Sequence, residues 1–385
     1  MKITDSIFNV GVNDHITDLF ESQFEIKNGM SYNSYVIMDE KITIMDTVEE
    51  KFKDEWLENI KNIIGDKKPE YLVIHHMEPD HSYNIENFLK IYPDTKVVGN
   101  AKTFSMIENF FPKVMIKDKV VVTESMELVI GKNTLKFIFA PMVHWPEVML
   151  TYLKEEKVIF SADAFGKFGA NDVKDNWEDE ARRFYYAIVA KYGLQVQNLL
   201  KKLVMIEVKK ICPLHGTILE DNLEKYIGFY DTWSKCLPEK QGVAIFYTSV
   251  YGNTKKCVTI FKAELEKRNT DVVITDLART DMSKSVMLAY MYPKIVLATT
   301  TYNMDIFPFM KDFINHLIDR NFSGRKFAFI ENGSWAPNAE KVMKNMIEGL
   351  KNITISDNGV HIKSSLSEKN YEEISLLADE FSKND

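Results

Sequence analysis

The segment Tyr71–Ser82, with the sequence YLVIHHMEPDHS, places four side chains that can bind a metal within six residues. These are His76, Glu78, Asp80 and His81, and they follow an apolar run typical of a buried strand. In a non-helical loop, side chains 76, 78 and 80 point to one side, while His81 can reach a second ion. Each residue alone is compatible with a solvated polar loop. Together they predict a metal-binding loop at the end of a strand.

Three further ligand-type residues follow strand-like runs: His144 in PMVHWPE, Asp163 in IFSADAFG and His215 in ICPLHG. Their recurrence at strand ends indicates one rim of a sheet sandwich, so we expect a dinuclear metal site. Four imidazoles and three carboxylates include no soft sulfur, which suits iron, manganese or zinc better than copper(I) or an iron–sulfur cluster. Trp145 and Pro146 are interpreted as packing residues without a catalytic role.

A second constellation follows the apolar run Val243–Thr248. Backbone amides and hydroxyls at a helix N-terminus bind phosphate without a lysine, because the amides and the helix dipole attract a dianion. Alone, such a turn is only a capping signal. At the first strand of a doubly wound pattern it resembles the flavodoxin phosphate loop, and FMN outranks a dinucleotide because the G-x-G-x-x-G fingerprint is missing. The loop comprises Thr248, Ser249, Val250, Tyr251, Gly252, Asn253 and Thr254.

Two later loops are expected at the same sheet edge, after the third and fourth strands of this pattern. Each is polar and carries one aromatic residue, Tyr302 or Trp335, which can hold the edge or face of a flavin ring or simply anchor the loop. The predicted flavin contacts in these loops are Thr300, Thr301, Tyr302, Asn303, Gly333, Ser334, Trp335 and Ala336.

The elements that must position the metal ligands are short strands alternating with helices over the first 235 or so residues. Helical patterns cover Phe52–Ile64, Lys102–Phe110, Glu178–Lys191 and Leu194–Val208. They predict an α/β sandwich of mixed strands with helices on the outer faces. Strands are expected at Tyr32–Met38, Ile42–Asp46, Val120–Thr123, Glu127–Ile130, Thr134–Ala140, Val148–Leu153 and Lys157–Ala162.

The pattern changes at the polar stretch SKCLPEKQG, residues 234–242, where we place a domain boundary. Beyond it, strand, loop and helix repeat about five times, which predicts a doubly wound parallel sheet. Its strands are expected at Val243–Thr248, Asp271–Asp276, Lys294–Thr299, Lys326–Ile330 and Thr354–Ile362, with helices beginning near Thr254, Lys284, Phe307, Asn338 and Glu368.

Composition limits the class of protein. A chain of 385 residues exceeds what one core usually supports, so two domains are expected, with one enlarged barrel as the rival. The net charge of −8 disfavours nucleic acid or an anionic membrane as partner. Three cysteines in no CxxC pair predict neither disulfides nor a thiolate metal site. No leader or spanning run is apparent, so we expect a cytoplasmic protein that is not exported.

The motif HMEPDH at residues 76–81 resembles the metallo-β-lactamase superfamily, specifically its flavodiiron branch. Zinc hydrolases of the superfamily carry HxHxDH, whereas Glu78 gives this chain the flavodiiron pattern HxExDH. The resemblance implies a metallo-β-lactamase-like αββα diiron domain over residues 1–240 and a doubly wound, flavodoxin-like FMN domain over residues 241–385. It implies that one iron is bound by His76, Glu78 and His144, the other by Asp80, His81 and His215, and that Asp163 bridges them.

The same resemblance implies an oxidoreductase that reduces dioxygen to water or nitric oxide to nitrous oxide, with electrons entering at FMN. No rubredoxin module with CxxC pairs follows the second domain, so a separate donor is expected, either rubredoxin or a reduced deazaflavin. A head-to-tail homodimer, or a dimer of such dimers, is also implied.

Two other functions remain open from the residues. A zinc hydrolase with a flavodoxin-like appendage is disfavoured by Glu78, because three carboxylates stabilise ferric iron more than they help a zinc-bound hydroxide. A non-enzymatic electron-transfer flavoprotein with a relic metal domain is disfavoured by the complete set of seven ligands. The ligands are common to dioxygen and nitric oxide chemistry, so the sequence does not select between them.

Overall fold

The computed structural model describes residues 1–383, and the chain divides into two compact units, Met1–Asp231 and Thr232–Asp385. The boundary expected near residue 240 falls in the segment between α7 (Leu223–Ser234) and β16 (Val243–Tyr247), whereas the two units divide within the last turn of α7. No helix within the described residues has the length and apolar character needed to cross a membrane.

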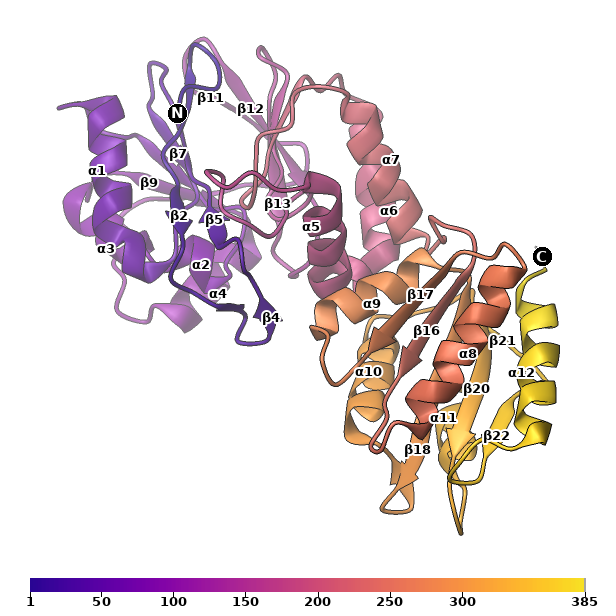
Figure 1. The fold of residues 1–385 in the computed structure, drawn as a ribbon. Helices are drawn as coiled ribbons and strands as arrows, with labels where there is room; N and C mark the ends of the chain where they lie inside the picture. The colour runs from indigo at the N-terminus through magenta and orange to yellow at the C-terminus, as the bar shows by residue number, and fades with distance from the viewer. Residues whose placement is uncertain (384–385) are drawn as a thin grey trace. The chain divides into compact units, whose positions relative to one another are not determined.

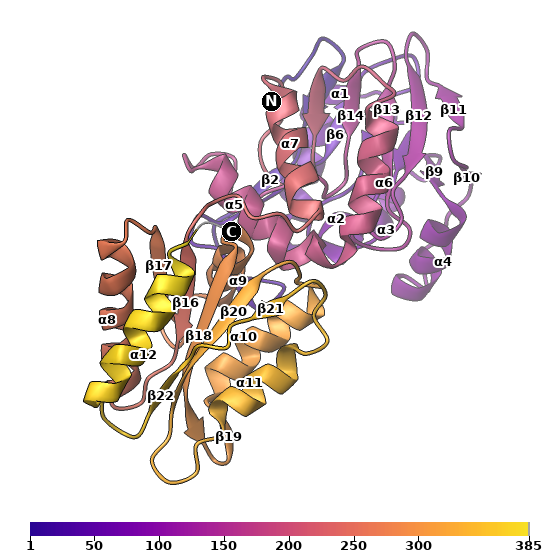
Figure 2. The ribbon, with the colours of Figure 1, turned by 90° about the vertical axis from the view of Figure 1, so that its right-hand side faces the viewer.

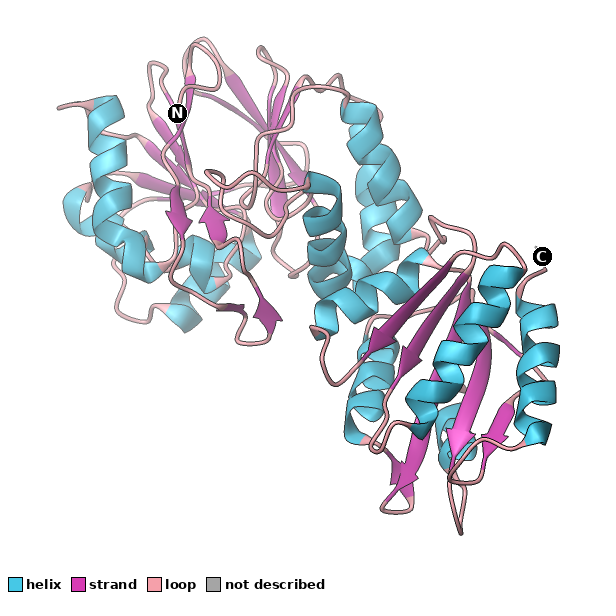
Figure 3. Cartoon of the chain, in the orientation of Figure 1, coloured by secondary structure: helices cyan, strands magenta, loops and turns pink. Residues whose placement is uncertain are grey.

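Two sheets form the centre of the first unit (Figures 1 and 3). Along the first sheet the strands are β1 (Ile7–Asn9), β6 (Tyr35–Ile37), β7 (Thr43–Met45), β8 (Tyr71–Val73), β9 (Lys96–Gly99) and β10 (Lys119–Val121). Along the second they are β11 (Glu127–Val129), β12 (Thr134–Phe139), β13 (Met149–Leu153), β14 (Val158–Phe160) and β15 (Lys210–Cys212). Two small ribbons pair β2 (Val12–Asp14) with β5 (Met30–Tyr32), and β3 (Leu19–Phe20) with β4 (Phe24–Glu25).

The two sheets pack face to face through one apolar core. Val73 and Val98 come from the first sheet, and Phe137, Met149 and Phe160 come from the second. Because each sheet has a second face to cover, helices lie outside both, with α1 and α3 on one side and α6 and α7 on the other (Figure 1). The helices of this unit are α1 (Lys53–Ile64), α2 (Pro79–Ser82), α3 (Ile85–Ile91), α4 (Ala101–Phe110), α5 (Trp177–Phe184), α6 (Gly193–Leu203) and α7.

Helix α1 shows how the sequence sets such a cover. Trp56, Ile60 and Ile64 are its buried residues, and their spacing of four places them on one face of the helix. The helix ends at Ile64, and its C-cap residue Gly65 has a positive φ of 60°, which glycine adopts without strain.

The second unit is a single, mainly parallel sheet with helices on both faces (Figure 2). Counted in chain order, its parallel strands lie 2-1-3-4-5, which is the flavodoxin-like arrangement. Its strands are β17 (Val272–Asp276), β16, β18 (Lys294–Tyr302), β20 (Lys326–Asn332), β21 (Thr354–Ile355) and β22 (Val360–Ile362), and β19 (Asp305–Ile306) pairs antiparallel with β18. Its helices are α8 (Asn253–Lys267), α9 (Met282–Met291), α10 (Pro308–Asp319), α11 (Ala339–Ile347) and α12 (Glu368–Phe381).

Helices α8 and α12 cover one face of this sheet (Figure 2). Phe261 of α8 and Phe381 of α12 belong to the apolar core between these helices and the strands. On the other face, Phe313 of α10 packs on Phe246 of β16 with ring centroids 4.5 Å apart. All five residues of β16 are buried, as expected for a strand covered on both faces.

The predicted fold class is confirmed, but some element bounds were wrong. The strand expected at Tyr32–Met38 is interrupted between β5 and β6, where buried Asn33 donates two hydrogen bonds to the carbonyls of Pro213 and Gly216. The helix expected over Glu178–Lys191 is regular only as α5 and continues as a π-helical turn.

Two other elements are shorter than expected. The helix predicted to reach Val208 ends at Leu203, and the strand predicted over Thr354–Ile362 is split into β21 and β22. Apolar periodicity reports a buried face, but it does not report where the chain turns away from it.

Candidate metal centre and flavin pocket

The predicted metal ligands of the first unit follow four strands. His76 comes after β8, His144 after β12, Asp163 after β14 and His215 after β15. Within the second sheet, β12 and β14 are both antiparallel to β13, and β15 is parallel to β14, so the carboxyl ends of these three strands share one edge. The strands therefore deliver their ligands to a common rim.

Asp80 and His81 correct one expectation. The segment was predicted to be a non-helical loop, but both residues lie in the short helix α2, with Pro79 at its first turn and Glu78 just before it. Thr47 fixes the end of this turn, because its backbone N–H and its hydroxyl both donate to the carbonyl of His81, at 2.9 and 2.8 Å.

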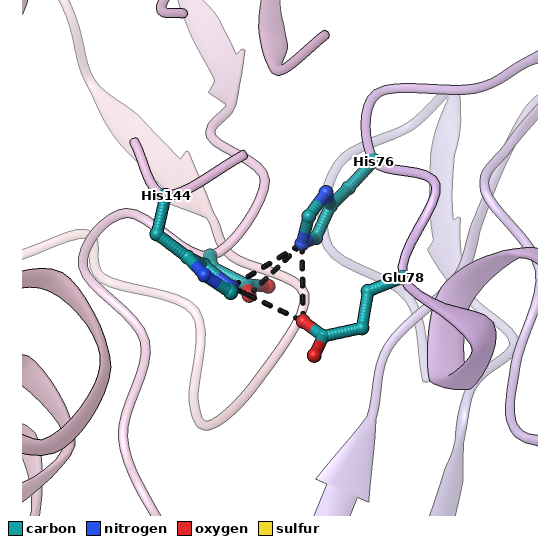
Figure 4. A group of neighbouring side chains, drawn as sticks. His76, Glu78 and His144 are labelled. Atoms are coloured by element: carbon teal, nitrogen blue, oxygen red, sulfur yellow. Dashed lines mark hydrogen bonds and ion pairs between the residues drawn. The ribbon is translucent and has the colours of Figure 1, made fainter. Parts of the chain in front are cut away.

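His76, Glu78 and His144 point toward one another (Figure 4). His76 Nε2 lies 3.2 Å from Glu78 Oε2 and 3.3 Å from His144 Nε2, and His144 Nε2 lies 3.1 Å from Glu78 Oε2. Asp163 Oδ2 completes this group at 3.2 Å from His144 Nε2.

Asp80, His81 and His215 form an adjoining group. His81 Nε2 lies 2.9 Å from His215 Nε2, and Asp80 Oδ2 lies 3.4 and 3.3 Å from these two nitrogens. Asp163 Oδ1 lies 3.2 Å from His81 Nε2, so the two oxygens of Asp163 face different groups.

These donor sets fit a pair of metal ions. Ligand atoms bound about 2.1 Å from one ion at right angles lie about 3.0 Å apart, close to the spacings observed here. Both carboxylate oxygens of Asp80 and Oδ1 of Asp163 are buried without a hydrogen-bond partner among the described residues. Buried carboxylate oxygens are rarely left unpaired in this way, and coordination would satisfy all three.

Burial and neighbouring charges shift the pKa values of the predicted ligands in opposite directions. Burial alone would lower the pKa of His144, but hydrogen bonds to Asp163 and Glu78 outweigh burial and raise the pKa to about 9. Burial alone would raise the pKa of Asp163, but the charges of His215 and His81 hold it well below its ordinary range.

Two groups behind the ligands were missed by the sequence analysis. Buried Glu147 accepts a hydrogen bond from His76 Nδ1 at 2.9 Å, and the carbonyl of Ser31 accepts one from His215 Nδ1 at 2.8 Å. Glu147 does lie in the PMVHWPE segment, but its partner is 71 residues earlier in the chain. No pattern in the sequence near either residue indicates that Glu147 and His76 are in contact.

Trp145 packs against the metal group, as predicted. Its ring meets the His76 ring edge to face at 5.3 Å and lies nearly parallel to the Phe110 ring at 6.2 Å. These contacts hold the imidazole in place through packing.

In the second unit, a cavity of about 630 Å³ lies at the carboxyl ends of β16, β18 and β20. Thirteen of the fifteen predicted flavin contacts line it: Ser249, Val250, Tyr251, Asn253, Thr254, Thr300, Thr301, Tyr302, Asn303, Gly333, Ser334, Trp335 and Ala336. Tyr251 is 94% exposed and Trp335 is 90% exposed, which leaves two aromatic faces available at the cavity mouth.

The other two predicted contacts, Thr248 and Gly252, do not line the cavity. The Thr248 hydroxyl is buried and hydrogen-bonded to that of Thr299 at 2.6 Å, where it ties β16 to β18. Gly252, with a φ of 90°, is the N-cap residue of α8. Both residues therefore stabilise the loop between β16 and α8 without lining the cavity.

Met304, Asn332 and Ser364 line the same cavity and were missed. Asn332 and Ser364 are joined by two hydrogen bonds of 3.2 Å, from Asn332 Nδ2 to the Ser364 carbonyl and from Ser364 N to Asn332 Oδ1. Ser364 follows an edge strand that the sequence pattern defined poorly, so nothing placed it beside the pocket.

A third group of acidic and histidine side chains, Glu331, Glu340 and His361, lies in the second unit. Glu331 accepts the backbone N–H of Glu340, and Glu340 pairs with both His361 and Lys344. These contacts already satisfy the cluster, and we assign no metal to it.

Comparison with known proteins covers both units. The family described as "ODP family beta lactamase" matches residues 30–216, and the "Flavodoxin domain" family matches residues 244–358. The flavo-diiron protein FprA2 of Clostridium acetobutylicum is 30% identical over 328 residues, which is 80% of each chain. A nitric oxide reductase of Moorella thermoacetica is 28% identical over 93% of this chain and 92% of its own.

A solved structure agrees at the level of the fold. Rubredoxin oxygen:oxidoreductase from Desulfovibrio gigas superposes with a TM-score of 0.94 over 99% of this chain and 97% of its own, at 24% identity. The likeness to FprA2 extends over both units, and the chain therefore belongs to the flavodiiron protein family.

Proposed function

We propose that this chain reduces dioxygen or nitric oxide at a pair of non-haem irons, using electrons that enter at FMN in the second unit. One observation carries the proposal: seven ligand-type side chains form two adjoining groups, and one carboxylate, Asp163, faces both. The relatives named above include both a nitric oxide reductase and an oxygen oxidoreductase, so both substrates remain candidates.

The roles of the metal ligands follow the two groups. His76, Glu78 and His144 would hold one iron, Asp80, His81 and His215 the other, and Asp163 would join them. When bound, the iron pair supplies redox chemistry and open coordination positions for a diatomic substrate. The chain's own contribution is a buried, preorganised set of three carboxylates and four imidazoles.

FMN would occupy the cavity of the second unit, with its phosphate at the N-terminus of α8. Ser249 shapes this loop, because its hydroxyl accepts the backbone N–H groups of Gly252 and Lys255, at 3.1 and 3.2 Å. Amides of the first helical turn attract the phosphate dianion. The exposed rings of Tyr302 and Trp335 would contact the isoalloxazine.

Rubredoxin is the donor that we propose, with a reduced deazaflavin as the alternative. The flavin pocket and the metal centre belong to different units of the chain. Membership of the flavodiiron family supports our proposal of a head-to-tail homodimer, or a dimer of such dimers, in which a flavin serves the metal centre of the partner subunit.

The zinc hydrolase alternative is not favoured, because the named relatives are redox proteins and Glu78 brings a third carboxylate to the donor set. Asp163→Ala tests the assignment. The substitution removes a donor from both groups at once, so we expect loss of both irons and of dioxygen and nitric oxide turnover, with FMN content unchanged. Two tightly bound irons and normal turnover in this variant would refute the assigned site.

A further inference from the structure

We propose that Glu147 is a positioning residue, which holds His76 as an Nε2 ligand and makes the two metal positions electronically unequal. The inference rests on the proposed function, in that it takes the two groups of side chains to bind iron. It concerns a side chain that contacts no metal position itself.

Glu147 forms two hydrogen bonds with the segment that carries the ligand His76. Its Oε1 accepts hydrogen bonds from His76 Nδ1 at 2.9 Å and from the backbone N–H of Met77 at 2.8 Å. Glu147 and His76 are both almost fully buried. A proton held on Nδ1 leaves the lone pair of the imidazole on Nε2, which is the nitrogen that faces Glu78 and His144.

The backbone of Glu147 is itself held in place. The side-chain amide of Asn100 donates to the carbonyl of Glu147 at 2.5 Å, and the Asn100 side-chain oxygen caps the start of α4. Glu147 also lies three residues after His144. One loop therefore supplies a ligand of the first group and orients a second ligand of the same group.

In the adjoining group, neither His81 nor His215 has a carboxylate behind its Nδ1 atom as His76 does. His215 Nδ1 donates to the neutral carbonyl of Ser31, and His81 Nδ1 has no hydrogen-bond partner among residues 1–383. A carboxylate behind an imidazole increases its basicity, whereas a carbonyl does so less. With the charged Glu147 at its Nδ1, His76 is thus expected to stabilise ferric iron more than it would with a neutral acceptor at that position.

Glu147→Gln isolates the charge. The amide keeps an oxygen for His76 Nδ1 and Met77 N, and Glu147 Oε2 has no hydrogen-bond partner among the described residues that the substitution could remove. Glu147→Ala removes the acceptor as well. Glu155→Gln is the matched control, because Glu155 also accepts a backbone N–H, that of Thr134 at 2.7 Å, and contacts no predicted ligand.

The experiment uses the full-length chain loaded with FMN and iron, and it measures iron per chain, iron loss to a chelator and redox titration of the iron by EPR. In the parent we expect two irons per chain. We expect Glu147→Gln to retain two irons, with one reduction step shifted to higher potential. In Glu147→Ala, one of two phases of iron loss should be about 10- to 100-fold faster. FMN content should not change in any variant.

Parent-like potentials and iron loss in Glu147→Gln would overturn the proposal, as would equal shifts in Glu147→Gln and Glu155→Gln. Acceleration of both phases alike would refute the inequality of the two positions. If Glu147→Ala does not fold, the comparison of Glu147→Gln with Glu155→Gln still tests the proposal. A parent protein that binds no iron pair would instead refute the proposed function, which keeps the two failures distinct.

Discussion

Glu78 contributes the anionic oxygen that distinguishes this donor set from that of a zinc hydrolase. Its Oε2 lies within 3.2 Å of both His76 Nε2 and His144 Nε2, so it shares one metal position with two imidazoles. Glu78→His would replace that oxygen with a neutral nitrogen suited to zinc. We expect zinc to displace iron, and dioxygen and nitric oxide turnover to fall at least about tenfold, with FMN reduction by the donor nearly unchanged.

Metal analysis, flavin reduction and substrate consumption on one preparation check each link of the Glu78 prediction. Glu155→Gln again serves as a control for a carboxylate that contacts no ligand. Full turnover with unaltered iron content would show that Glu78 does not set the choice of metal.

Protons on the predicted ligands make metal uptake dependent on pH. A histidine must lose its proton to bind a metal, and the pKa of His144 is raised to about 9 by Asp163 and Glu78 despite its burial. At pH 7 this imidazole is mostly protonated, so metal affinity should increase by about tenfold per pH unit for each proton displaced, up to about pH 9.

Titration of the iron-free protein with Mn²⁺ in two buffers of different ionisation enthalpy measures the protons released. We expect at least one proton per chain at pH 7 and a smaller number above pH 9. Release of no protons at pH 7 would contradict the raised pKa of His144.

At this scale the gathering of the seven predicted ligand residues into two adjoining groups could be expected, because each is a strong ligand type that follows an apolar run. The contacts of Glu147 and Ser31 could not, because their roles exist only through partners 71 and 184 residues away in sequence. Groups that orient ligands are defined by contacts across the fold, whereas ligands themselves are partly defined by local pattern.

The same contrast holds for whole elements. The helix α1, with its regular apolar spacing, and the strand β16, with its continuous apolar run, were predicted nearly to the residue. The four-residue helix α2 was missed because one turn contains too few residues to show a period of 3.6. The helical conformation of α2 matters for the site, because this turn places Asp80 and His81 in the same group of predicted ligands.

The loop after β20 is held close to the flavin cavity by a glycine. A Cβ at Gly333 would lie 2.8 Å from the Cα of Pro337, so Gly333→Ala must displace the backbone of this loop. Overpacking of this kind costs about 1–3 kcal/mol. We expect FMN to bind about 5- to 150-fold more weakly, measured by flavin fluorescence during titration of the flavin-free protein.

Gly349→Ala is the matched control for the loop. No heavy atom lies within 4 Å of a Cβ at Gly349, so the same chemical change meets no neighbour there. Equal FMN affinity in both variants would remove the loop after β20 from the flavin site.

At the scale of the whole molecule, the sequence indicates two domains but leaves their boundary open by several residues. The segment before β16 is polar and contains proline, which marks a linker, yet it is anchored to the second unit. Arg325 Nη1 donates to the Cys236 carbonyl at 2.7 Å, and the N–H groups of Glu239 and Lys240 donate to the Met291 carbonyl. Composition could not show these contacts, because their acceptors and donors lie far along the chain.

A pair of fragments turns these contacts into a test of domain independence. Thr232–Asp385 and Gln241–Asp385 both contain the sheet and the flavin cavity, so both should fold and bind FMN. The shorter one leaves Arg325 without the Cys236 carbonyl and loses the Met291 contacts, a cost of about 1–2 kcal/mol. Its Tm should be about 2–8 °C lower, measured by calorimetry at matched FMN concentration. Equal melting temperatures would place residues 232–240 outside the second unit, and a folded fragment that binds a nicotinamide dinucleotide but no FMN would contradict the flavin assignment.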